Sequence, residues 1–222
     1  MAQIYLYTDW DWEGAAREFR RALALNPNLA VAHAHYAWYL NLFWRQDEAL
    51  AEMRRAMELD PLAPLWATWI GDLHYSVGQY DSAIDALRNA RELDPNFPWA
   101  FYKLGDVYAE KGMYDEAVAA HQKAVAANAD WAWALARTYA LAGRRNEAQK
   151  LVTEYEKGAM PDAFGLAAVY TSLGEKDKAF QWLQVAYKSR HPFTPWLKLP
   201  YFEGLRADPR LQDLLRRMNL PK

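Results

Sequence analysis

One small residue recurs in this sequence at a fixed step. Alanine stands at Ala15, Ala49, Ala83 and Ala117, each 34 residues after the last, and again at Ala148 and Ala179 after steps of 31. Between these positions apolar residues recur three and four places apart, which predicts short amphipathic helices. Such helices cannot bury an apolar face alone, so successive copies have to stack. The sequence therefore predicts an all-α array of repeated helix pairs.

The clearest copy of the unit lies in residues 101–129. Its first helix carries Phe101, Leu104, Gly105 and Tyr108, and its second carries Tyr114, Ala117 and Ala124. Gly112 stands between them, where the positive φ that glycine readily adopts would end the first helix. Proline follows the second helix of the first three units, at Pro27, Pro61 and Pro95, and prevents that helix from continuing.

This lettering resembles the tetratricopeptide repeat, a helix–turn–helix unit of 34 residues. The resemblance implies a right-handed α-solenoid superhelix of about six units that ends in a C-terminal capping helix. The units are expected near residues 1–27, 28–61, 62–95, 96–129, 130–160 and 161–189, which together form the repeat array 1–189. Residues 190–222 are expected to form an irregular Pro-containing segment and the capping helix, with Asp208 as N-cap and Pro209 at the first position.

The chain departs from the repeat pattern in two ways. Trp10 and Trp44 stand where the later units have the turn glycine. The last two units are three residues short, and we place the missing residues in the second helix of a unit or in the turn after it.

The entry to the array and its tail resemble those of one bacterial subgroup. In that subgroup a TolB-like segment and tetratricopeptide repeats follow a winged-helix DNA-binding domain, a protein kinase or a nucleotide cyclase domain. The resemblance, carried by residues 7–12 and by the chain after Ser189, implies that this chain is a fragment of a larger bacterial regulatory protein. DNA binding or kinase activity would then belong to residues before Met1.

Composition argues against several functions. The net charge of −2 gives no overall attraction to nucleic acid or to an anionic membrane, and no apolar run approaches the length of a membrane span. The chain has no cysteine, which excludes thiolate chemistry and Cys-based metal sites. It also lacks the His-Glu-x-x-His, phosphate-loop and Gly-x-Ser-x-Gly motifs. We expect no enzymatic activity, no catalytic residue, no cofactor and no metal, in a cytoplasmic protein; the periplasm is the alternative if a parent protein spans the membrane.

Tryptophan and tyrosine are abundant, at 11 and 14 residues. The family resemblance implies a concave groove, lined by the first helices, that binds peptides. The register places ten candidate residues there: Trp38, Trp69, Asp72, Tyr75, Trp99, Tyr102, Lys103, Asp106, Trp133 and Arg137. The sequence leaves open which of the aromatic residues line an open groove and which pack against the neighbouring repeat. The lysine–asparagine pair that some relatives use to hold a peptide carboxylate is missing from its expected places.

These observations favour a protein-interaction scaffold that binds a peptide or partner domain in an aromatic-lined groove. One alternative is a sensor that binds a small molecule or glycan in the same groove by stacking on tryptophan faces. Another is self-association into a homo-oligomer, because the truncated first helix is expected to leave an apolar end uncovered near Tyr5 and Leu6. We expect no nucleic-acid or membrane partner for this segment.

Overall fold

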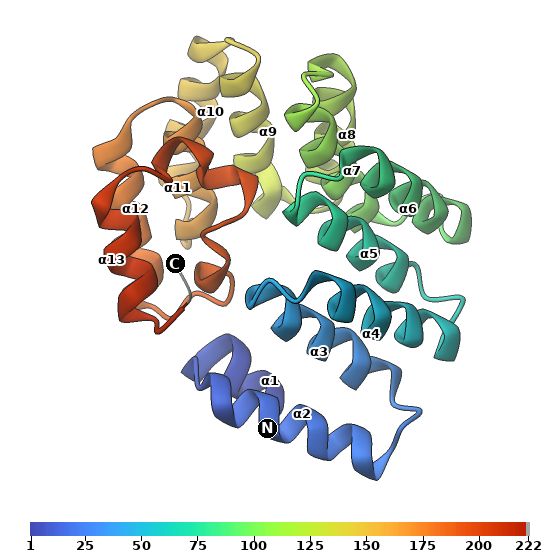
Figure 1. Ribbon diagram of the computed structural model, residues 1–222. Helices are drawn as coiled ribbons and strands as arrows, with labels where there is room; N and C mark the ends of the chain where they lie inside the picture. Colours follow the sequence, from blue (N-terminus) through green and yellow to red (C-terminus); the bar gives the residue numbers. More distant parts are fainter. Residues whose placement is uncertain (221–222) are drawn as a thin grey trace.

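The computed structural model describes residues 1–220, and this part of the chain is helical with no β-strand (Figure 1). The last two residues of the predicted capping region lie outside the described residues. The chain begins with α1 (Ala2–Ile4), which continues into a π-helical turn, Tyr5–Asp9. The other helices are α2 (Trp12–Leu25), α3 (Ala30–Leu42), α4 (Gln46–Leu59), α5 (Pro64–Ser76), α6 (Tyr80–Leu93), α7 (Pro98–Glu110), α8 (Tyr114–Ala127), α9 (Ala132–Leu141), α10 (Arg145–Glu156), α11 (Ala163–Ser172), α12 (Lys176–Lys188) and α13 (Pro209–Arg217).

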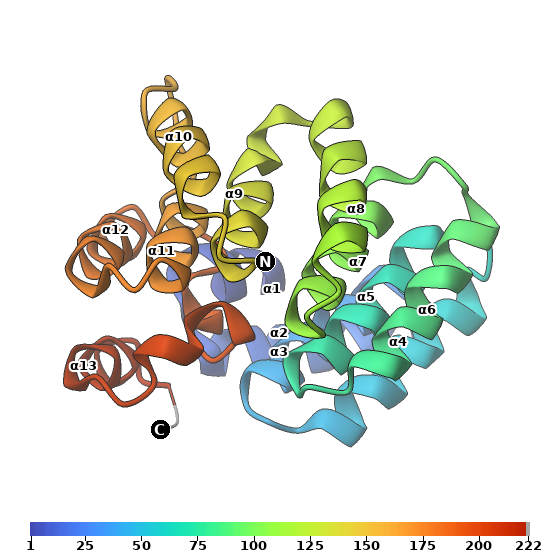
Figure 2. The same cartoon turned by 90° about the horizontal axis from the view of Figure 1, so that it is seen from above.

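Consecutive helices from α3 to α12 form antiparallel pairs that stack into a curved α-solenoid (Figure 2). The first helix of each pair faces the inside of the curve, and the second lies outside it, as α6 and α12 show. The alanines of the sequence register, from Ala15 to Ala179, are all fully buried. Their small side chains let the two helices of a pair approach closely, as a densely packed interior requires. The unit boundaries drawn from the sequence stay a prediction.

The turn inside each pair is left-handed whether or not it contains glycine. Gly78, Gly112, Gly143 and Gly174 have φ between 73° and 76°. Trp10 and Trp44, which replace this glycine, adopt the same region with φ of 56° and 61°. A side chain in this conformation costs roughly 1–2 kcal/mol. For Trp10 the cost is offset by packing, because its ring is buried against Tyr187.

The position predicted for the missing residues of the shortened units is wrong at the first of them. The helix α8 has 14 residues, the same length as α4 and α6. The following helix α9 has 10 residues where α7 has 13. A 3-10 turn, Ala129–Trp131, precedes α9. The array therefore shortens in a first helix, on its inner side.

The segment after α12 crosses the inside of the curve. It contains a 3-10 turn (Thr194–Trp196), a 3-10 helix (Pro200–Leu205) and α13. In Figure 1 the part before α13 runs in orange-red between α11 and the helices α3 and α5, and α13 lies beside α12. The helix α13 begins at Pro209, and the Asp208 side chain accepts a hydrogen bond from the backbone N–H of Arg210, so the predicted N-cap is present. We call residues 191–220 the tail.

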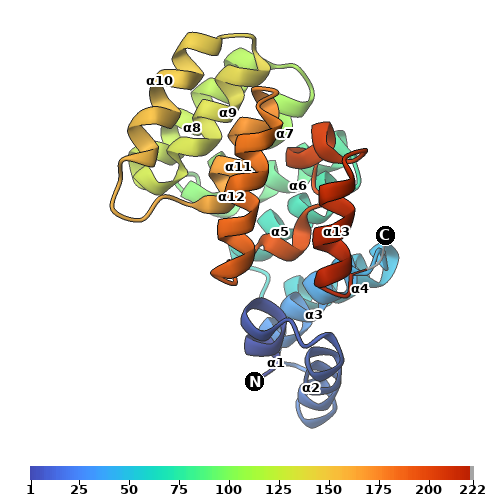
Figure 3. The same cartoon turned by 90° about the vertical axis from the view of Figure 1, so that its left-hand side faces the viewer.

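The two ends of the array meet (Figure 3). The rings of Trp10 and Tyr187 lie 5.6 Å apart, and the Arg190 guanidinium lies 4.4 Å from the Trp10 ring centre. The Trp12 indole N–H donates to the Met218 carbonyl at 2.7 Å. The expectation of an uncovered apolar end is wrong for Leu6, because this side chain is 0% exposed and belongs to the core. Within residues 1–220 no helix combines the length and the apolar character that a membrane crossing needs.

Candidate functional site

The ten residues predicted for the groove all lie on first helices. Trp38 is on α3; Trp69, Asp72 and Tyr75 are on α5; Trp99, Tyr102, Lys103 and Asp106 are on α7; Trp133 and Arg137 are on α9. They fall into two groups by burial. Six are buried (Asp72, Tyr75, Tyr102, Asp106, Trp133 and Arg137), and the other four are half-buried (Trp38, Trp69, Trp99 and Lys103). We call the first group the inner surface and the second group the rim.

Tyr201 of the tail occupies the centre of the inner surface. Its ring centre lies 5.7 Å from those of Tyr75 and Trp133, and the Arg137 guanidinium lies 4.8 Å from it. Its hydroxyl donates to Oδ2 of Asp106 at 2.5 Å. Tyr201 is 2% exposed and Asp106 is 0% exposed. The side chain is therefore held on both sides and at its tip, as an anchor residue is in a binding pocket.

Asp106 lies beside a lysine, a histidine and an arginine. Lys103 Nζ lies 3.7 Å from its Oδ2, and His121 Nε2 lies 3.6 Å from its Oδ1. Burial raises the pKa of Asp106, but the neighbouring His121 and the charges of Lys103 and Arg137 outweigh burial and hold it below its ordinary value. The carboxylate is thus ionised, which makes it a strong acceptor for the Tyr201 hydroxyl.

The second carboxylate, Asp72, behaves in the opposite way. Lys103 Nζ lies 3.2 Å from its Oδ1. Burial raises the pKa of Asp72 to about 6, although the Lys103 charge opposes this rise. Two carboxylates that share one lysine therefore have pKa values displaced in opposite directions. Both are sealed from solvent by packing, so the arrangement favours recognition of a docked side chain over proton transfer to a soluble substrate.

Arg137 is only partly satisfied. Its Nη2 pairs with Glu110 Oε1, which also accepts a hydrogen bond from the Tyr75 hydroxyl at 3.4 Å. The Nε and Nη1 atoms of Arg137 are buried without a hydrogen-bond partner among the described residues, and so is Oδ1 of Asp106. The inner surface therefore has more hydrogen-bonding capacity than the tail uses.

The three tryptophans of the rim come from successive repeats. The Trp38 and Trp69 rings lie 6.0 Å apart, and Trp69 also contacts His35 at 5.1 Å. Trp99 lies 5.3 Å from Trp131, whose ring stacks on Tyr102. His35 and Trp131 are half-buried and extend the rim. Trp131 was not among the residues predicted from the sequence, because it lies in the 3-10 turn before α9 rather than on a first helix.

The tail also reaches the first two units. The Trp196 ring lies 5.9 Å from Trp38 and stacks at 5.8 Å on Tyr7, whose hydroxyl is 3.0 Å from Nδ1 of His35. Burial lowers the pKa of His35 to about 4, so its imidazole is neutral at neutral pH. The sequence missed Trp196, Tyr201 and the buried His121 as site residues. The one signal for the tail pair was two large aromatic residues in an apolar segment outside the repeat register.

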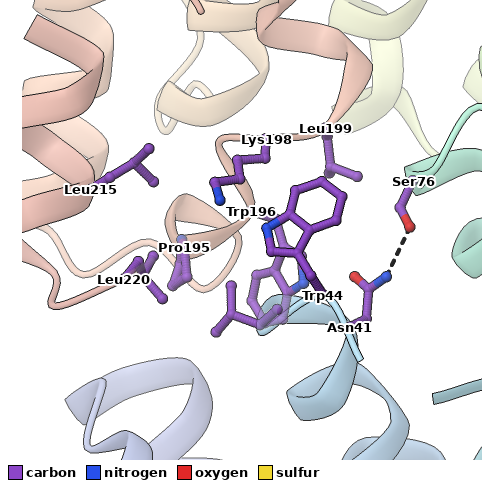
Figure 4. Close-up of a pocket in the computed structure, with 10 residues that line it drawn as sticks. Asn41, Trp44, Ser76, Pro195, Trp196, Lys198, Leu199, Leu215 and Leu220 are labelled. Carbon is purple, nitrogen blue, oxygen red and sulfur yellow. Dashed lines mark hydrogen bonds between the residues drawn. The ribbon is translucent and has the colours of Figure 1, made fainter. Parts of the chain in front are cut away.

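A small pocket marks the seam between tail and array (Figure 4). On the array side it is lined by Asn41, Leu42, Trp44 and Ser76, and on the tail side by Pro195, Trp196, Lys198, Leu199, Leu215 and Leu220. Asn41 donates to the Ser76 hydroxyl at 2.8 Å, and Lys198 Nζ lies 4.9 Å from the Trp44 ring centre. Trp44 stays 46% exposed, so the tail does not close this seam completely. Across residues 1–220 no cluster of three acidic or histidine side chains is placed to hold a metal ion.

Two family models match the chain. A model described as a TPR repeat matches residues 71–112, and one described as a tetratricopeptide repeat matches residues 100–130. No curated protein matches the sequence.

Solved structures share the fold along most of the chain. The crystal structure of PilW, a widely conserved type IV pilus biogenesis factor, has a TM-score of 0.64 at 19% identity, covering 96% of this chain and 94% of PilW. PilF of Pseudomonas aeruginosa has a TM-score of 0.61 at 20% identity, covering 97% of this chain and 94% of that one. A thermophilic TPR protein of Thermus thermophilus has a TM-score of 0.59 at 19% identity, with 86% of this chain and 97% of that one covered. At these identities the likeness concerns the fold.

Proposed function

Because this chain is a tetratricopeptide-repeat protein and so belongs to a class of protein-interaction scaffolds, we propose that it binds a partner segment on the rim of its concave surface. The observation that carries the proposal is the state of Trp38, Trp69 and Trp99. They come from three successive first helices, and they stay half-buried while the inner surface is sealed.

The chemistry of the rim favours an apolar or proline-rich segment. Indole rings offer large flat surfaces at a low cost in rotamer entropy, and a row of them suits an extended proline-containing peptide or one face of a helix. Lys103 is the rim's cation, and Asp72 and Asp106 already lie within 4 Å of its ammonium group. The partner is therefore expected to bind through apolar contact more than through an acidic group.

The test uses peptides selected from a displayed random library on the immobilised full chain. Their affinities are then measured against the unchanged chain, Trp69→Ala, Trp99→Ala and the control Trp182→Ala. Trp182 is a half-buried tryptophan on α12 whose indole N–H donates to Glu156, away from the rim. We expect the rim variants to weaken binding about tenfold or more, as anchor residues do, and the control to leave it unchanged.

The opposite result would assign these tryptophans to packing between repeats. In that case both rim variants would lower the melting temperature while the selected peptides bound as before. A panel of small molecules and glycans, followed by tryptophan fluorescence, tests the same surface for the sensor alternative.

We also propose that the chain is part of a larger bacterial regulatory protein, which would make the array its interaction module. The resemblance of residues 7–12 and of the tail to one bacterial subgroup supports this proposal. Reading the residues encoded immediately before Met1 tests it, and a sequence there without an effector domain would count against it. The absence of enzymatic activity and the cytoplasmic location stay predictions.

A further inference from the structure

We infer that the inner surface is a latent peptide site, which the tail occupies as an intramolecular ligand and which accepts a tyrosine-anchored aromatic segment when the tail leaves. This inference goes beyond the proposed function, because it concerns the sealed surface rather than the rim.

The first argument is how the tail is attached. In residues 192–206 each backbone–backbone hydrogen bond outside the regular helices joins residues three apart along the chain. None of them connects residues 192–206 to the array, whereas the two ends of the tail do use backbone groups, at His191 and Met218. Three rings of the tail pack on rings of the array: Trp196 on Trp38 and Tyr7, Tyr201 on Tyr75 and Trp133, and Phe202 on Phe164. This is how a bound peptide engages a groove, with a few anchors in pockets.

The second argument is that the fit is incomplete. Thr194 Oγ1 and Trp196 Nε1 of the tail are buried without partners among the described residues, and on the array Asp106 Oδ1 and two nitrogen atoms of Arg137 are in the same state. Each buried polar group left unpaired costs about 1–3 kcal/mol. Together with the pocket at the seam, these atoms show that the polar groups of the tail and of the inner surface are not fully matched, although Leu197, Phe202 and Leu205 of the tail are buried in the core.

The side chains of the tail that occupy the inner surface indicate what kind of partner segment could replace it. The seated segment presents a tryptophan and, five residues later, a tyrosine whose hydroxyl reaches Asp106. A replacement segment has to donate a hydrogen bond to Asp106, as the Tyr201 hydroxyl does. It also has to place a flat ring between Tyr75 and Trp133. A partner segment with the same aromatic spacing would satisfy both requirements. A phosphorylated tyrosine would not, because its charge would face the Asp106 carboxylate.

The test uses the full chain and a labelled peptide with the sequence of residues 191–206. The tail in cis has a high effective concentration, so the unchanged chain should bind this peptide weakly. The Tyr201→Phe chain loses only the hydroxyl that holds the tail, and its groove stays intact. We expect it to bind the peptide about tenfold more tightly than the unchanged chain does. We also expect a peptide with phenylalanine in place of its tyrosine to bind this chain about tenfold more weakly.

Tyr170→Phe is the matched control. The Tyr170 hydroxyl donates to Glu156 Oε1 at 2.6 Å, a tyrosine–carboxylate bond of the same kind that does not involve the tail. It should lower stability without increasing peptide binding. Hydrogen exchange of the unchanged chain provides a second readout, in which amides of residues 194–205 should exchange faster than those of α7 and α11.

The inference would be overturned if the Tyr201→Phe and Tyr170→Phe chains bound the peptide equally, or if neither bound it. It would also be overturned if the tail amides exchanged only together with the repeats. Neither experiment uses the Trp69→Ala or Trp99→Ala variants, and the tail peptide is not a peptide selected on the rim, so this inference and the proposed function fail separately.

Discussion

Tyr201 and Asp106 are 95 residues apart in the chain and are joined by a hydrogen bond of 2.5 Å that no solvent reaches. The bond fastens an irregular segment to the middle of a regular array. Asp106 itself is held ionised by the charges of Lys103 on its own helix α7 and Arg137 on α9, together with the neighbouring His121.

This pair predicts a graded effect of substitutions at Asp106. Asp106→Ala removes the acceptor and leaves the Tyr201 hydroxyl buried and unpaired, so we expect a loss of about 3–5 kcal/mol, as for a broken buried charge pair. Asp106→Asn keeps an oxygen that can accept from Tyr201 and should cost less. Urea unfolding measures both, and equal losses would show that the hydrogen bond does not stabilise the tail.

The packing of Trp133 against α11 predicts that Gly165 cannot be enlarged. A Cβ at this position would lie 2.4 Å from Cγ of Trp133, so Gly165→Ala has to displace an aromatic wall of the inner surface. We expect a loss of about 1–3 kcal/mol from overpacking. Gly204→Ala in the tail is the control, since its nearest neighbour would be Thr171 Cγ2 at 3.5 Å, and it should change stability by less than about 0.5 kcal/mol. Thermal unfolding of the two variants tests this difference, and similar melting temperatures would contradict the predicted clash.

The raised pKa of Asp72 predicts a specific dependence of stability on pH. Burial raises this pKa from 3.8 to about 6, so between these values the folded chain holds a proton that the unfolded chain has lost. The contribution of Asp72 to the free energy of unfolding therefore falls as pH rises from about 4 to 6, by about 3 kcal/mol in total. The Asp72→Asn chain has no titrating carboxyl group at this position, so its free energy of unfolding lacks this pH-dependent contribution. The unchanged chain should thus gain stability relative to Asp72→Asn when the pH is lowered from 7 to 4 in urea titrations. A difference that stays constant over this range would refute the shift.

The hydrogen bond from Trp12 to the Met218 carbonyl predicts that Trp12 helps to hold the C-terminal end of α13. Trp12→Phe removes the donor and should cost about 1 kcal/mol, with faster hydrogen exchange in α13. Trp66→Phe is the matched control, because Trp66 is similarly buried and its indole N–H has no partner among the described residues. Losing that N–H should cost less. If Trp66→Phe were the more damaging change, the Trp12 hydrogen bond would have no measurable role.

Much of the array could be predicted from sequence because its determinants are local. The alanines at a constant step and the glycines of the turns specify helix pairs without reference to distant residues. Even Trp10 and Trp44 follow the left-handed turn that their positions predict, although their side chains disfavour it. The resemblance to the repeat family placed all ten candidate residues on first helices for the same reason.

The state of the candidate site could not be predicted in the same way. Whether Tyr102 or Trp133 faces solvent depends on the tail, and the tail has no period that would indicate its path. The burial of Asp106 could not be predicted either, because its hydrogen-bond donor, Tyr201, is 95 residues away in the chain. The shortening of α9 was placed in the wrong helix because a step between alanines does not show which of two helices is shorter.

The contact of Trp10 with Tyr187 changes how this array should unfold. An open solenoid behaves as a one-dimensional chain of neighbours, whose terminal repeats fray first. Here Trp10 of the first unit packs on Tyr187 of the last, and Trp12 bonds to Met218 of the tail, so the two terminal units support each other. Unfolding should then be closer to all-or-none than in an open array of this length. Folding should also be slower, because the contact between the first and last units joins residues that are far apart in the chain.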